Sequence, residues 1–264
     1  MAMDDHVAVE EEPEQLDREE MPIANVVFII AMEAEALPLV NQFQLTEDPD
    51  SPFPKGVPWT RYHGIYKDLQ INIMWPGKDI VLGCNNVGTV PAALVTYASI
   101  QVLKPDLIIN IGTAGGLKVK GACGGDIFLI SDVAFHHRRN PLPIRDRYGI
   151  GARKTIHTSN LLKRLDLKVG KLSTGDSFDI SPVDEALVMA NDATVIDMEG
   201  AAVAHVADLL SVPAIFLKAV TNVVDDKKPS VEEFLQNVPA VTAALAQTAA
   251  QVADFINGKC LSEL

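Results

Sequence analysis

The feature that most constrains the fold is a short apolar run at residues 25–31, Asn-Val-Val-Phe-Ile-Ile-Ala. Its apolar residues are nearly continuous and several are β-branched, whereas a strand with one solvated face alternates apolar and polar residues. This pattern is typical of a strand that is buried on both faces, which requires helices on each side of a sheet. The run therefore predicts an α/β fold.

The rest of the chain repeats this pattern, with helical stretches between several of the apolar runs. The irregular segment 141–165, with two prolines and several basic side chains, is expected to be an excursion on the surface. Strands that alternate with helices indicate a mostly parallel sheet with helices on both faces. The expected strands are 69–75, 80–84, 107–111, 127–131, 195–197 and 214–220, and the expected helices are 90–103, 201–210 and 231–256.

Domain organisation follows from composition and charge. Residues 1–22 contain nine acidic residues and one basic residue, and they have few large apolar side chains. Such a segment is expected to be a disordered, solvated tail. Residues 23–264 contain no repeat and no Pro- or Gly-rich linker, so we expect a single domain there.

The same composition argues against several functional classes. The sequence pI of about 4.8 and the lack of a basic stripe argue against a nucleic-acid-binding protein. No apolar run is long enough to cross a membrane, and the acidic N-terminus is unlike a secretory signal. Three cysteines without C-x-x-C spacing fit a reducing compartment, so we expect a cytoplasmic protein. The scattered histidines predict no metal site, and no cofactor is expected.

Ligands of open α/β sheets bind outside the carboxyl ends of the strands, so the residues that follow each apolar run are the candidates for chemistry. Glu33 and Glu35 follow the first run and begin a predicted helix. Acidic residues in a first turn complement the helix dipole, and this is the favoured interpretation for Glu33. Glu35 is the better candidate for a general base, because an acid beside a buried strand end is partly desolvated.

Three other segments place polar groups at strand ends. Residues 110–116, Asn-Ile-Gly-Thr-Ala-Gly-Gly, lack a Walker lysine and G-x-G-x-x-G spacing, but they allow close backbone approach and offer the hydroxyl of Thr113. A tight structural turn explains this segment equally well. Residues 196–204 bring Met198 and Glu199 to the start of an alanine-lined helix; Glu199 could accept hydrogen bonds from a ribose diol, or only cap the helix. Residues 172–179 offer Phe178 for stacking on a planar base, although the segment alone is an ordinary strand-to-loop transition.

Together with Thr221-Asn222 at the end of the last strand, these segments resemble the 5′-methylthioadenosine/S-adenosylhomocysteine nucleosidases, specifically those of plants. The resemblance covers residues 23–264. It implies a single-domain, three-layer α/β fold with a central mixed sheet, partly closed like a barrel, and a homodimer that binds an adenine nucleoside thioether. Water would displace adenine, as in methionine salvage.

The resemblance also implies roles for individual residues. Glu35 corresponds to the base that activates water, and Asn222 occupies the position of the family's catalytic aspartate, which protonates or polarises adenine N7. The other positions implied to bind substrate are Thr113 beside the thioribose, Phe178 and the backbone around Asp179 in the adenine pocket, Met198 and Glu199 at the ribose, and Ile196 and Asp197.

Asn222 is a departure from the family pattern, because an amide has no acidic proton to give at neutral pH. It could be an engineered Asp→Asn change, which the otherwise complete site favours, a natural inactive relative, or a tolerated amide donor. Two other functions stay open: a non-enzymatic nucleoside-binding or storage protein, and a purine nucleoside phosphorylase. Phosphorolysis is disfavoured because Glu35 would repel phosphate, and Lys218 alone does not form a cationic cluster.

Overall fold

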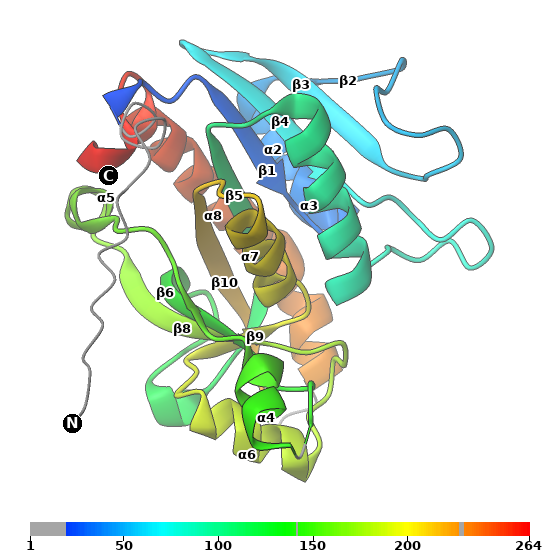
Figure 1. Cartoon of the computed structure of the whole chain (residues 1–264), viewed down its shortest axis with the longest axis vertical. Coiled ribbons are helices and arrows are strands. Elements are labelled where there is room, and N and C mark those ends of the chain that lie inside the picture. Colours follow the sequence, from blue (N-terminus) through cyan, green and yellow to red (C-terminus); the bar gives the residue numbers. More distant parts are fainter. Residues whose placement is uncertain (1–19, 141, 227–229) are drawn as a thin grey trace, which may run out of the picture.

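The computed structural model describes residues 20–140, 142–226 and 230–264. In this part of the chain, ten strands form one sheet in the order β10-β6-β8-β9-β5-β1-β4-β3-β2, with β7 paired to β6 (Figure 1). The predicted disorder of the acidic tail falls almost entirely on residues 1–19, outside the described residues. The strands are β1 (Asn25–Ile29), β2 (Thr46–Glu47), β3 (Thr60–Tyr66), β4 (Leu69–Trp75), β5 (Leu107–Gly116), β6 (Ile127–Phe135), β7 (Arg153–Lys154), β8 (Lys168–Thr174), β9 (Val195–Asp197) and β10 (Ala214–Val223).

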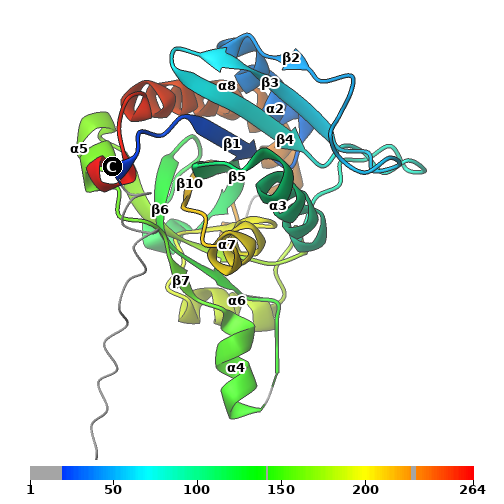
Figure 2. The same ribbon diagram turned by 45° about the horizontal axis from the view of Figure 1, so that its top comes forward.

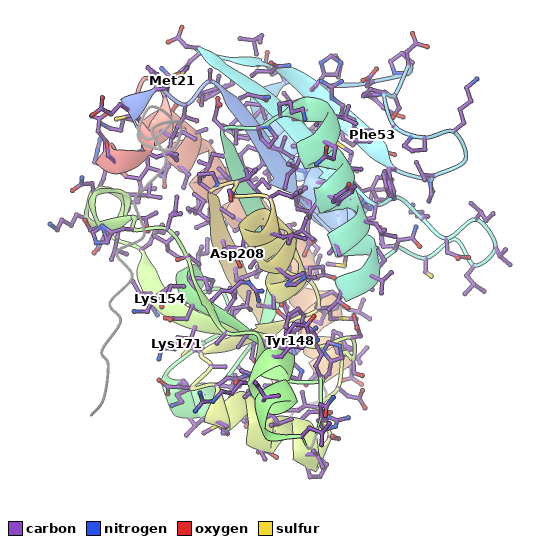
Figure 3. The ribbon with its side chains drawn as sticks, viewed as in Figure 1. Met21, Phe53, Tyr148, Lys154, Lys171 and Asp208 are labelled. Carbon is purple, nitrogen blue, oxygen red and sulfur yellow. The ribbon has the colours of Figure 1, made fainter. Side chains whose placement is uncertain are left out.

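Helices cover both faces of the sheet, as Figure 2 shows: α2 and α8 lie on one face, and α3 and α7 pack together on the other. The described helices are α2 (Glu33–Phe43), α3 (Thr89–Leu103), α4 (Pro143–Ile150), α5 (Ser159–Leu165), α6 (Pro182–Ala190), α7 (Gly200–Leu209) and α8 (Ser230–Ile256), with short 3₁₀ turns η1 (Lys118–Lys120) and η2 (Leu261–Glu263).

The first strand is buried on both faces, as its continuous apolar pattern predicts. Val26 and Phe28 belong to the core that packs under α2 and α8, whereas Val27 and Ile29 belong to the core under α3 and α7. All four side chains are at most 2% exposed. Alternate residues of a strand point to opposite faces, so one continuous run supplies both cores.

The sheet is mixed and partly closed into a barrel, which confirms the expected fold class. β10 pairs in parallel with β5 and antiparallel with β6. β6 continues through β8 to β9, and β9 returns antiparallel to β5 at Gly115 and Gly116. The strands β5, β10, β6, β8 and β9 therefore form a closed ring, and β1, β4, β3 and β2 extend from it as an open sheet.

The strand predicted at residues 80–84 is wrong. Ile80, Val81 and Leu82 are 87%, 84% and 78% exposed in a loop. The carboxylate of Asp79 accepts hydrogen bonds from the backbone nitrogens of Val81 and Leu82, at 2.9 and 2.7 Å, and closes a tight turn. Asp and Asn side chains often form such turns, and this local bonding replaces strand pairing here.

The predicted irregular excursion at 141–165 is also only partly right, because it contains α4, β7 and α5. Pro143 is the first residue of α4, where a missing N–H costs nothing and the fixed φ favours a helix. Leu161 of α5 is fully buried against the core under α2 and α8. β3, an antiparallel partner of β4, was not predicted, because its partly polar composition hides the strand pattern.

Candidate active site

A cavity of about 210 Å³ opens where β1, β5, β9 and β10 end, beside the first turn of α2. Eight of the nine residues predicted to form a site line this cavity, and Asp179 does not. The lining residues are Ala31, Met32, Glu35, Val87, Thr113, Ala114, Gly115, Ser177, Phe178, Ile196, Asp197, Met198, Glu199, Thr221, Asn222, Val224 and Phe234.

Glu35 is buried, with 2% of its surface exposed, because α2 begins shortly after β1 and its first turn places this side chain over the strand ends. One carboxylate oxygen accepts hydrogen bonds from the Thr113 backbone nitrogen at 2.6 Å and from the Thr113 hydroxyl at 2.8 Å. The other accepts from the Met32 nitrogen at 3.1 Å. Burial raises the pKa of Glu35, although these bonds and the charge of Lys218 act in the opposite direction.

Lys218 supplies a positive charge beside the cavity, although it is not among the lining residues. Its ammonium group lies 2.8 Å from a carboxylate oxygen of Asp197, and both side chains are 1% exposed. Asp197 also accepts hydrogen bonds from the Thr174 hydroxyl at 2.6 Å and the Gly200 nitrogen at 2.8 Å. Burying a charge is tolerated only with such compensation, so these four groups form one structural unit.

A Cβ at Gly112 would lie 3.3 Å from the Lys218 nitrogen and 3.4 Å from a carboxylate oxygen of Glu35. Because Gly112 has no side chain, the Lys218 ammonium group and the Glu35 carboxylate can both lie close to the space on β5 that a Cβ would fill. Because both groups are buried, solvent screens the charge of Lys218 less than at the surface, and this charge lowers the pKa of Glu35.

Glu199 lies between β9 and α7 and accepts a hydrogen bond from the backbone nitrogen of Gly88 at 2.9 Å. Burial, with the nearby charge of Asp197, raises the pKa of Glu199 to about 8. Its neighbour Met198 lines the same cavity. A carboxyl group and a thioether side by side can hold the polar and apolar parts of a sugar.

Asn222 is 3% exposed and lines the cavity from the end of β10. Its carbonyl oxygen accepts a hydrogen bond from the Thr221 hydroxyl at 3.0 Å. The pairing of β10 with β5 shifts register between Val220 and Asn222, so Asn222 lies opposite Gly115. Such an irregularity re-aims side chains, and the amide nitrogen lies beside Gly115, 3.6 Å from where a Cβ would be.

Aromatic side chains form the outer wall. Phe178 is 39% exposed and packs edge-to-face on Phe234 of α8, with ring centroids 5.4 Å apart. Asp179, which was predicted with Phe178, is exposed and lies outside the set of lining residues. The described geometry therefore assigns its side chain no contact with the cavity, and a contribution from its backbone stays a prediction.

Three residues that contribute to the site were not predicted from the sequence. Lys218 was weighed only as an isolated cation, although a lysine inside a continuous apolar strand signals a buried partner. Gly88 and Phe234 gave no signal, because a backbone N–H and a half-buried ring become functional only through their placement. Asp225 and Asp226 do not replace Asn222 in the cavity lining: Asp225 accepts bonds from the backbone nitrogens of residues 118 and 119 at 2.6 and 2.9 Å.

Residues 20–140, 142–226 and 230–264 contain neither a candidate metal site nor a candidate membrane-spanning helix. No group of three or more His, Cys, Asp or Glu side chains is placed to hold a metal ion there. Within the same ranges, no helix has the length and apolar character needed to span a bilayer.

The fold and this cavity place the chain among the nucleoside-cleaving α/β proteins. The sequence model of the Phosphorylase superfamily matches residues 25–254. A 5′-methylthioadenosine nucleosidase of Arabidopsis thaliana is 62% identical over 96% of both chains, and a 5′-methylthioadenosine/S-adenosylhomocysteine nucleosidase of the same plant is 59% identical over 93% of this chain and 97% of its own.

A solved structure agrees with these sequence comparisons. The apo form of the Arabidopsis thaliana 5′-methylthioadenosine nucleosidase has a TM-score of 0.92 and 64% identity, over 92% of this chain and all of that chain. The chain therefore belongs to the Phosphorylase superfamily and, within it, to the plant 5′-methylthioadenosine/S-adenosylhomocysteine nucleosidase family.

Proposed function

We propose that this protein hydrolyses the N-glycosidic bond of 5′-methylthioadenosine, releasing adenine and the thioribose. The observation that carries the proposal is that Glu35 and Asn222 line one cavity whose wall also contains Met198 and Glu199. The Arabidopsis relatives that share about 60% of its sequence are named for this substrate. Both are named for methylthioadenosine but only one for S-adenosylhomocysteine, so the first is the primary substrate and the second is the compound to test next.

The residues divide the reaction between the two ends of the bond. Glu35, once ionised, takes a proton from water that attacks the anomeric carbon of the sugar. Met198 and Glu199 hold the ribose, and Phe178 lies against the base. Negative charge develops on the departing adenine, and the amide N–H of Asn222 is the group we assign to N7.

An amide can polarise N7 through a hydrogen bond but cannot transfer a proton to it. Losing a general acid costs roughly 10²–10⁴-fold in rate, so we expect slow turnover with retained binding. Asn222 in an otherwise complete site is what an engineered Asp→Asn change would leave. A storage or binding protein on the same fold is the rival, and its activity would not respond to an acid at this position.

Hydrolysis is favoured over phosphorolysis by the charges around the cavity. Its described lining contains Glu35, Asp197 and Glu199 but no Lys or Arg. The nearby Lys218 is already paired with Asp197 at 2.8 Å. A phosphate dianion would therefore meet acidic side chains in the described lining, without an unpaired cation there to receive it.

Adenine release, measured in phosphate-free buffer for the chain and for Asn222→Asp, tests the proposal. We expect slow release that rises by roughly 10²–10⁴-fold in the variant. Equal rates of adenine release would show that residue 222 does not supply the proton. Dependence on added phosphate would favour a phosphorylase, and binding without turnover in both proteins would favour a storage protein.

We further propose a cytoplasmic homodimer that serves methionine salvage. Support for the dimer comes from α3, where Val90, Leu94 and Tyr97 are 65%, 55% and 51% exposed, and from Leu209 of the adjacent α7 at 68%. Figure 1 shows both helices on one side of the molecule. Exposed apolar side chains grouped in this way are typical of a subunit interface. Leu94→Glu should yield monomers in light scattering; an unchanged mass would rule out this surface.

A further inference from the structure

Two hydrogen bonds fix the turn that leads into α3. The carboxylate of Asp176, in the loop after β8, accepts from the Thr89 backbone nitrogen at 2.5 Å and from the Thr89 hydroxyl at 2.7 Å. The ring nitrogen Nε2 of His137 lies 3.1 Å from the same carboxylate. Asp176 thus caps a helix 87 residues away in sequence, whose own N-cap residue, Gly88, has no side chain to do so.

The same turn presents Gly88 to the ribose-binding carboxylate. Gly88 has a φ of 105°, which L side chains rarely adopt, and a Cβ on it would lie 2.8 Å from Oδ1 of Asp176. Its backbone N–H donates to Glu199 at 2.9 Å. Asp176 therefore holds the backbone unit that in turn holds Glu199.

We propose that Asp176 is a positioning residue, which acts on the nucleoside through Gly88 and Glu199. This inference rests on the proposed function, because it takes Glu199 as the group that receives the sugar hydroxyls. Without the Asp176 carboxylate, the turn at Gly88 and Thr89 would lose two hydrogen bonds. The orientation of Glu199 would then no longer be fixed. Fixed orientation matters because a carboxyl that must be ordered on binding gives weaker affinity.

The position of Asp176 in the chain suggests a second role, support of the loop beside the base, and the experiment must distinguish it from positioning of Glu199. Asp176 directly precedes Ser177 and Phe178, which line the cavity on the side assigned to the base. A residue that only supported this loop would affect the base pocket. A residue that acts through Glu199 would affect the sugar and spare the base.

The test compares methylthioadenosine with adenine, which lacks the sugar. Calorimetric dissociation constants are measured for the full chain, for Asp176→Ala and for Gly88→Ala. We expect both variants to bind methylthioadenosine about tenfold more weakly, near the upper end of the contribution of one neutral hydrogen bond, and adenine with unchanged affinity. Glu185→Gln, an exposed acid on the following helix, is the matched control and should bind as the parent does.

A double-mutant cycle tests whether Asp176 affects nucleoside binding through Glu199. In a Glu199→Gln background, Asp176→Ala should weaken methylthioadenosine binding by less than twofold, because the group it positions has been altered. Equal losses for adenine and nucleoside, or a full tenfold loss in the Glu199→Gln background, would overturn the inference while leaving the proposed function intact. Failure of the parent chain to bind either ligand would instead overturn the proposed function, and this inference with it.

Discussion

Glu35 and Thr113 are joined by two hydrogen bonds to a single carboxylate oxygen, from the backbone nitrogen at 2.6 Å and the hydroxyl at 2.8 Å. The second oxygen of Glu35 accepts only the longer bond from the Met32 nitrogen among the described contacts. The pairing fixes the carboxylate across the gap between α2 and β5. It orients the carboxylate through hydrogen bonds without a direct ion pair, which suits the general-base role that we propose for Glu35.

Replacing Glu35 by Gln should therefore remove water activation and spare binding. In an Asn222→Asp background, where turnover is fast enough to measure, we expect adenine release to fall roughly 10²–10⁴-fold. Glu33→Gln is the control from the same helical turn, because Glu33 pairs with Lys78 outside the cavity lining and should not affect the rate. Similar losses in both variants would contradict the assignment.

The pH dependence of kcat/KM should report the raised pKa of Glu35. Burial disfavours its ionised form, so the base-competent fraction increases with pH and the rate should rise through a range above that of an ordinary carboxyl. In the chain with Asn222, residue 222 should cause no fall of kcat/KM at high pH, because an amide does not titrate. The Asn222→Asp variant should show such a fall. A pH profile of unchanged shape in this variant would argue against proton donation by residue 222.

Lys218→Met should destabilise the fold and alter catalysis together. It leaves Asp197 buried without its cation, a change that costs about 3–5 kcal/mol in the free energy of unfolding. The charge of Lys218 lowers the pKa of Glu35 and Glu199, so its loss should move the rising limb of the pH profile upward. Urea denaturation measures the loss of stability, and the pH profile of kcat/KM measures the shift in pKa.

Lys171→Met provides the comparison for that experiment. Lys171 pairs with Asp192 at 3.1 Å, but both side chains are about half exposed. Solvent screens such pairs, so little change in stability is expected. If the two lysine variants unfold at the same urea concentration, the interior ion pair does not have the role described.

Glu199 should make the protein less stable as pH rises from 7 to 9. Its folded pKa of about 8 lies above the ordinary 4.5, so the folded state keeps a proton that the unfolded state has lost. The folded state then binds more protons, and the free energy of unfolding declines as pH rises through the folded pKa. Denaturation of the chain and of Glu199→Gln at both pH values tests this; parallel declines would refute it.

Much of the architecture could be predicted because its signals are local. Residues 25–31 predicted a doubly buried strand, and β1 supplies both cores. Prediction from composition was wrong where local backbone preferences and short-range hydrogen bonds determined the structure. The apolar segment 80–84 forms a turn bonded to Asp79, and Pro143 begins a helix in a segment predicted to be irregular.

The sequence by itself determined which residue types stand at the strand ends, including the amide at position 222, because strand periodicity and chain order are encoded locally. Only the tertiary structure decided which ends meet. It places β10 between β5 and β6, pairs Lys218 with Asp197, and brings Gly88 to Glu199 over 111 residues. These contacts depend on strand order and burial, and both arise only when the sheet closes and excludes water.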